Sequence, residues 1–91
     1  MQMLTRPFLK TLATKAHSLR PTVIIGGKGL SENVHNEIDA ALLAHELVKI
    51  RVNATSREER KAMIDQIISQ HESALVQQIG HILVIYRQNL D

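Results

Sequence analysis

The chain has 91 residues and a mass of 10.2 kDa, a size that suits one hydrophobic core, so residues 1–91 should form a single compact domain. Its apolar content of 44% excludes a disordered chain, and its lack of cysteine excludes disulfide frameworks, thiolate metal sites and a cysteine nucleophile. The net charge of +2 is uneven, because residues 1–31 carry +5 and residues 32–91 carry −3, and a basic N-terminal third favours an anionic partner.

The first predicted element is a helix that starts at Thr5, a suitable N-cap, and ends before Pro21. Five apolar residues fall on one arc of about 100° and should be buried: Phe8, Leu9, Leu12, Ala16 and Leu19. Arg6, Lys10 and His17 project together from the opposite side. Arg6 and Lys10 lie four residues apart and repel each other, a cost that an external anion would offset.

A strand, a glycine loop and a second helix follow. Residues 22–25 are β-branched throughout and largely apolar, so this strand should be buried on both faces. Residues 26–29 read Gly-Gly-Lys-Gly and break the strand. Ser31 can cap a helix that runs to about His45. The inner face of that helix should consist of Val34, Ile38, Ala41 and Leu42.

Alternation with a period of two marks the second strand, in which Val48, Ile50 and Val52 should face the core. Lys49 and Arg51 occupy the alternate positions and therefore share its polar face.

The remaining sequence predicts a third helix and a hairpin. Residues 56–59 match a capping box that opens a helix over residues 57–70. Its inward residues should be Met63, Ile64, Ile67 and Ile68. Strands over residues 74–79 and 82–87 flank Gly80, whose position in a two-residue loop favours a type II′ turn. The order αβαβαββ predicts an α/β fold in which three helices cover a mixed sheet of four strands.

The glycine loop has a physical use, because glycines let backbone amides approach phosphate oxygens closely at the N-terminus of a helix. Lys28 adds a mobile positive charge, so the loop could hold a sugar-phosphate backbone as the GxxG loop of KH domains does. A turn that needs glycine only for its geometry is the alternative. Mononucleotide and dinucleotide motifs do not fit. A Walker A loop needs lysine and then Ser or Thr directly after its second glycine, but Leu30 follows Gly29, and Glu32 stands where a dinucleotide motif needs its last glycine.

The sequence offers no catalytic machinery and no metal site. No two of the five histidines lie three or four residues apart, and no spacing of paired carboxylates stands out. Arg57, Arg60 and Lys61 lie beside Glu58 and Glu59, and we interpret them as part of a balanced, solvated helix face. We therefore expect a protein that is not an enzyme and uses no cofactor or metal.

Phe8 and Tyr86 are the only aromatic residues, which argues against RNA-recognition folds that stack bases on several exposed rings. The longest unbroken apolar run near the C-terminus covers residues 82–86, far short of the roughly 20 residues of a membrane helix. The N-terminus lacks a secretory apolar core. We expect a cytoplasmic monomer with no membrane contact.

Four stretches together resemble the CRM family, named for chloroplast RNA splicing and ribosome maturation. They are KAHSLRP at residues 15–21, VIIGGKGLS at residues 23–31, HELVKIRV at residues 45–52 and VQQIGHILVIYR at residues 76–87. The resemblance implies an RNA-binding fold related to the C-terminal domain of translation initiation factor three, in which the GxxG loop contacts RNA. It also implies association with precursor large ribosomal subunits, as in the stand-alone bacterial members.

The leading hypothesis is an RNA-binding protein that docks on ribosomal RNA in a precursor large subunit and assists its assembly. The candidate RNA-binding residues are Gly26, Gly27, Lys28, Gly29, Arg6, Lys10, His17, Arg20, Lys49 and Arg51. An alternative is a protein-interaction module on assembly particles, in which Glu32, Glu37 and Asp39 meet a basic ribosomal protein. A small enzyme ranks last.

Overall fold

The computed structural model describes residues 4–54 and 56–89. Its elements follow one another as α1 (Arg6–Ala16), β1 (Val23–Ile25), α2 (Glu32–His45), β2 (Leu47–Val52), α3 (Arg57–Gln70), β3 (Ala74–Ile79) and β4 (Ile82–Tyr86). The strands form one sheet in the order β1-β2-β4-β3, with β1 parallel to β2 and the other neighbours antiparallel. The structure thus confirms the predicted α/β fold with its αβαβαββ order and four-stranded mixed sheet.

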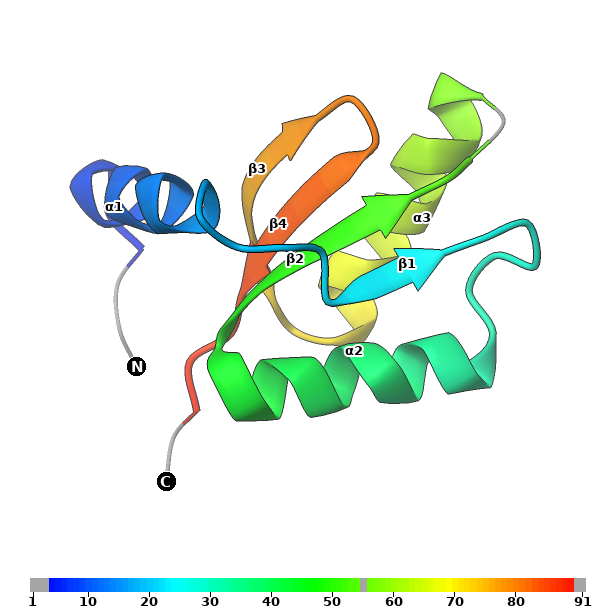
Figure 1. Cartoon of the computed structure of the whole chain (residues 1–91), viewed down its shortest axis with the longest axis horizontal. Helices are drawn as coiled ribbons and strands as arrows, with labels where there is room; N and C mark the ends of the chain where they lie inside the picture. The colour runs from blue at the N-terminus through cyan, green and yellow to red at the C-terminus, as the bar shows by residue number, and fades with distance from the viewer. Residues whose placement is uncertain (1–3, 55, 90–91) are drawn as a thin grey trace.

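The hydrophobic core lies between one face of the sheet and the helices α2 and α3 (Figure 1). Ile38 and Leu42 of α2 and Ile67 of α3 are fully buried there against Val48 and Ile50 of β2. This arrangement confirms the period-two pattern of β2 and the predicted inner faces of both helices. No helix in the described part of the chain is both long and apolar enough to cross a membrane.

Helix α1 packs on the opposite face of the sheet. Leu83 and Ile85 of β4 belong to the core, so Val84 and Tyr86 point to the other face, where both are buried. The ring of Phe8 on α1 meets the ring of Tyr86 edge to face, with 5.5 Å between centroids. Because α1 lies near one end of the sheet in Figure 1, the rest of this face, which we call the open face, is not covered by a helix.

Local sequence signals start each helix where predicted. The side chain of Thr5 accepts a hydrogen bond from the Phe8 amide, and Ser31 and Ser56 cap α2 and α3 in the same way. At the hairpin tip Gly80 adopts a φ of 56°, a conformation that glycine reaches without strain. These signals are local, so they could be read from the sequence alone.

The end of α1 differs from the prediction, because the helix stops at Ala16 and Leu19 is 37% exposed. The reason is a side chain from another element. The Lys49 ammonium on β2 donates hydrogen bonds to the carbonyl oxygens of Ala16 and Leu19, at 3.0 and 3.2 Å. These hydrogen bonds satisfy carbonyl groups at the end of the helix, so the helix ends several residues before Pro21.

The prediction that β1 is buried on both faces of the sheet is wrong. Val23 and Ile25 are buried in the core, but Ile24 between them is 61% exposed. The strand lies at the edge of the sheet, and Ile24 points to the open face, which α1 leaves uncovered there. In contrast, β4 lies between two strands, and side chains on both of its faces are buried.

Candidate nucleic-acid interface

The GxxG loop is a tight turn at the edge of the molecule. The Gly29 amide donates to the Gly26 carbonyl oxygen at 3.0 Å, and Gly29 itself has a φ of 69°. A Cβ atom at Gly29 would also lie 3.4 Å from the terminal methyl group of Met63 on α3. The Met63 methyl group could accommodate such a Cβ atom, so the positive φ of the turn explains why residue 29 is glycine.

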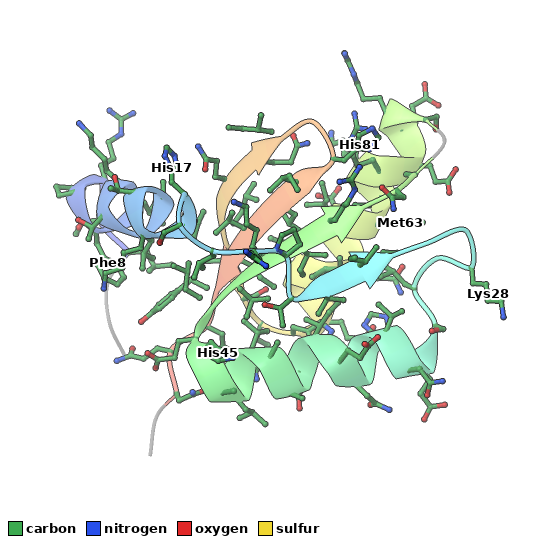
Figure 2. All side chains as sticks on the ribbon, viewed as in Figure 1. Phe8, His17, Lys28, His45, Met63 and His81 are labelled. Carbon is green, nitrogen blue, oxygen red and sulfur yellow. The ribbon has the colours of Figure 1, made fainter. Side chains whose placement is uncertain are left out.

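Gly26 and Gly27 have no such explanation. Both are exposed, a Cβ atom at either would meet nothing within 4 Å, and neither has a positive φ. Lys28 points away from the body of the protein at the tip of the loop (Figure 2). Two glycines in open space leave backbone that a ligand can approach closely, which is the property that phosphate binding requires.

The loop leads directly into α2. Leu30 packs against the core and fixes the end of the loop, and Ser31 then caps the helix. The first amides of α2 add partial positive charge beside the loop, although Glu32 in the first turn offsets part of it.

The two bases of β2 have different roles on the open face. Arg51 is exposed and pairs across the strands with Ile24, two residues before the loop, so the structure places it close to the glycines. Its guanidinium donates to the Asn53 side chain at 3.1 Å. Lys49 lies farther from the loop and holds the end of α1, so it adds positive charge to this face while its ammonium already has protein partners.

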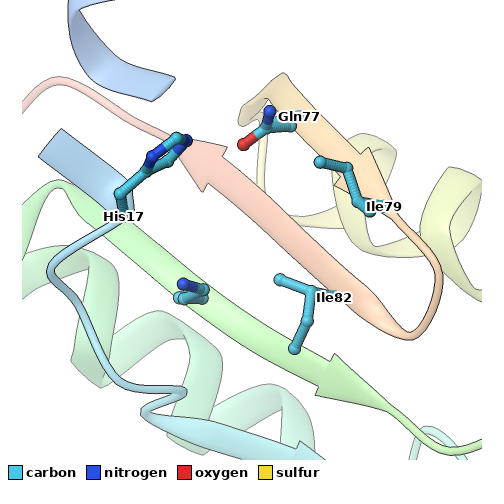
Figure 3. Close-up of a pocket in the computed structure, with 5 residues that line it drawn as sticks. His17, Gln77, Ile79 and Ile82 are labelled. Atoms are coloured by element: carbon cyan, nitrogen blue, oxygen red, sulfur yellow. The ribbon is translucent and has the colours of Figure 1, made fainter. Parts of the chain in front are cut away.

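A groove of about 330 Å³ crosses the open face between the end of α1 and the β3–β4 hairpin (Figure 3). It is lined by His17, Lys49, Gln77, Ile79 and Ile82. The isoleucines offer an apolar floor, and the imidazole and amide offer hydrogen bonds, a combination that suits an unstacked nucleobase. Among the described residues that line it, none is acidic.

The basic residues of α1 lie far from the loop. Arg6 and Lys10 are exposed on α1 at one end of the long axis, whereas Lys28 lies at the other end (Figures 1 and 2). The molecule measures 33 Å along this axis. His17 and the exposed Arg20 come between them in the chain, so one RNA would have to cross the open face to reach both ends.

The acidic residues of α2 are not equally available. Glu32 and Glu37 are exposed, but the Asp39 carboxylate forms an ion pair with the Arg87 guanidinium at 3.0 Å. One of the three charges that the protein-interaction alternative needs is therefore partly neutralised within the chain.

The structure brings together two histidines that the sequence did not link, of which His71 is buried and His35 is half-buried. Nδ1 of His35 on α2 lies 2.9 Å from Nε2 of His71, which follows α3 and is 6% exposed. The residues are 36 positions apart, so no spacing on a single helix could reveal them. The described residues contain no group of three side chains suited to holding a metal ion.

This pair predicts that stability falls in mild acid. Burial, and then the neighbouring His35 and Arg87, lower the pKa of His71 below 6.5, while Asp39 acts in the opposite direction. The folded state therefore favours neutral His71, whose contribution is complete above pH 6.5 and is lost as the pH falls through the lowered pKa.

Thermal melting between about pH 8 and pH 5 measures this effect. The parent protein should lose stability on acidification, and His71→Gln should flatten that profile, whereas His17→Gln at an exposed position should leave it unchanged. Parallel profiles for the parent and His71→Gln would assign the acid sensitivity to other groups.

Comparison with known proteins places the chain in a family. Residues 4–87 match the CRS1 / YhbY (CRM) domain. The chain belongs to this family. An RNA-binding protein of Haemophilus influenzae is 48% identical over 82 residues, which cover 90% of this chain and 80% of that protein. A Pseudomonas aeruginosa protein, named as a probable RNA-binding protein, is 37% identical over 86 residues, covering 94% of this chain and 83% of the relative.

The fold of the CRM domain is also found in a solution structure. A hypothetical protein from Staphylococcus aureus, for which RNA binding has been suggested, superposes with a TM-score of 0.82 at 34% identity. The match covers 98% of this chain and 93% of that protein. The family resemblance seen in the sequence is thus confirmed over nearly the whole chain.

Proposed function

We propose that this CRM-domain protein binds RNA through the GxxG loop, residues 26–29, and the basic open face beside it. The observation that carries the proposal is the open space around Gly26 and Gly27, which packing and backbone geometry do not require to be glycine. The names of the bacterial relatives support RNA as the ligand. Replacing Gly27 and Lys28 together by aspartate tests this assignment, because it should weaken RNA binding without unfolding the protein.

In the proposed mechanism, backbone amides of the loop and the Lys28 ammonium hold phosphate oxygens, and the N-terminus of α2 adds its partial charge. Arg51 supplies a further charge close to the loop. The open-face groove accepts an unstacked base from the same RNA. The protein acts by positioning RNA, as a cytoplasmic monomer without bond chemistry, cofactor or metal.

We further propose that the RNA is ribosomal and that the protein assists assembly of the large subunit from its precursor. The experiment is crosslinking of the protein to RNA in cells, followed by sequencing of the attached fragments. Fragments should concentrate in large-subunit ribosomal RNA, and the protein should cosediment with precursor particles. Fragments spread evenly over cellular RNAs would contradict the ribosomal part of the proposal and leave general RNA binding intact.

Helix α1 provides a test of how far the interface extends. If Arg6 and Lys10 each contact a phosphate, replacing both by glutamine should weaken binding to different RNA sequences alike. It should also flatten the dependence of log affinity on log salt by up to about two units. Filter binding over a salt series measures both quantities. An unchanged salt slope would show that α1 lies outside the interface. This outcome is compatible with the position of α1 at the opposite end of the molecule from the loop (Figure 1).

A further inference from the structure

A second groove, which we call the α3–hairpin groove, lies between α3 and the β3–β4 hairpin and has a volume of about 590 Å³. Its lining residues are Arg57, Arg60, Lys61, Ile64, Asp65, Leu75, Gln78 and Gly80. β3 separates it from the open-face groove, because Gln77 and Ile79 line the first groove and Gln78 between them lines the second.

The helical periodicity places the basic and acidic residues at the start of α3 on different faces. Arg57, Arg60 and Lys61 share one helix face with Ile64, and this face turns toward the hairpin. Of the described residues, Glu58 and Glu59 are not among those that line the groove, and Asp65 is its one carboxylate. The sequence led us to expect one helix face with balanced charges. The structure instead places the three basic residues together on the side that lines the groove.

The floor of the groove suits a base as well as a phosphate. Leu75 is 47% exposed, so an apolar side chain of β3 is open to a ligand within the groove. Ile64 extends this apolar floor, and the Gln78 amide donates to the Gly80 carbonyl oxygen at 2.7 Å, which holds the side chain in place at the rim.

Helix α3, which lines the groove, lies in the same half of the molecule as the GxxG loop (Figure 1). Met63 on α3 lies close to Gly29, so α3 runs beside the loop. The hairpin tip is tied to the end of β2, because the Val52 amide there donates to the His81 carbonyl oxygen at 2.7 Å. Arg60 in turn lies 3.5 Å from Nδ1 of His81.

We propose that the α3–hairpin groove is a second RNA-binding surface, entered by the strand that the GxxG loop holds. Arg57, Arg60 and Lys61 contact phosphates, and an unstacked base lies on Leu75. The charge of the groove indicates the class of partner. Three basic side chains and one carboxylate line it, and this excess of positive charge is complementary to a polyanion. This inference rests on the proposed function, because the loop supplies the first contact with the RNA.

Crosslinking at a single site tests the contact directly, because the chain has no cysteine and one introduced thiol is labelled uniquely. Leu75→Cys carries a photoreactive maleimide in the groove, and Leu43→Cys, 60% exposed on α2, carries it on another surface. With a hairpin RNA bearing a mixed-sequence single-stranded extension, the label at position 75 should crosslink RNA and the label at position 43 should not. Equal crosslinking at both positions, or none at 75, would overturn the proposal.

Removing the positive charges of the groove tests how much they contribute to RNA affinity. Arg57→Gln, Arg60→Gln and Lys61→Gln combined should weaken binding of this RNA at least about tenfold. They should also flatten the salt slope by up to about two units, since each phosphate contact on a single strand contributes about 0.7. Glu58→Gln with Glu59→Gln, which removes charge from the same helix turns, should not weaken binding.

The outcomes separate this inference from the function on which it rests. If the parent fails to bind RNA, the proposed function fails and the groove with it. If the parent binds RNA and the loop variant does not, but the groove variant binds normally, the groove alone is excluded. Loss of cosedimentation with ribosomal particles at unchanged RNA affinity would instead assign the groove to an acidic protein segment and overturn the proposal.

Discussion

Replacing Gly27 and Lys28 together by aspartate should weaken RNA binding by about tenfold to more than a hundredfold. The change amounts to three units of charge at the loop, and loss of even one charge-assisted hydrogen bond costs roughly 1.5 to 3 kcal/mol. Phosphate repulsion then adds to that loss. Equilibrium binding at fixed salt, with cosedimentation on ribosomal particles as the cellular counterpart, measures the effect.

The double variant should fold nearly as well as the parent. Both substituted positions are exposed, Gly27 has no positive φ, and a Cβ atom at Gly27 meets nothing within 4 Å. Gly29, which does require glycine, is retained. Asparagine at both positions is the matched control, since it has the size of aspartate without its charge and should give an intermediate loss. A folded double variant that binds like the parent would show that the loop is only a turn.

Ile25→Ala should destabilise the protein by about 2–5 kcal/mol, because it removes a fully buried side chain and leaves a cavity in the core. The neighbouring Ile24→Ala should cost less than about 1 kcal/mol, because Ile24 is 61% exposed. Urea unfolding of the two variants measures both free energies. Similar losses would contradict the edge position of β1 and the uncovered open face on which the proposed interface depends.

The sequence was sufficient for the features that depend on neighbouring residues. Helix starts at Thr5, Ser31 and Ser56 follow from hydroxyl capping, and the alternation of β2 follows from its period. The end of α1 was not accessible in this way, because Lys49, 33 residues away, closes the helix. The exposure of Ile24 depends on strand order, which no single segment contains.

The same distinction applies to the candidate site. The spacing of the glycines located the loop, but only the structure separates Gly29, whose positive φ favours glycine, from Gly26 and Gly27, which have no such constraint. The three bases of α3 share a helix face by their spacing, but only the structure shows that this face turns toward the hairpin and lines a groove. The His35–His71 pair likewise arises because α2 and the end of α3 meet in space.

The central claim is that the GxxG loop binds RNA phosphate through backbone amides, and an NMR titration of the parent protein with RNA tests it without any substitution. The account predicts that the amide resonances of Gly26, Gly27 and Lys28 shift most strongly, and that added salt reverses these shifts together with binding. Binding accompanied by shifts confined to the exposed acidic side of α2, with the loop resonances unmoved, would contradict it.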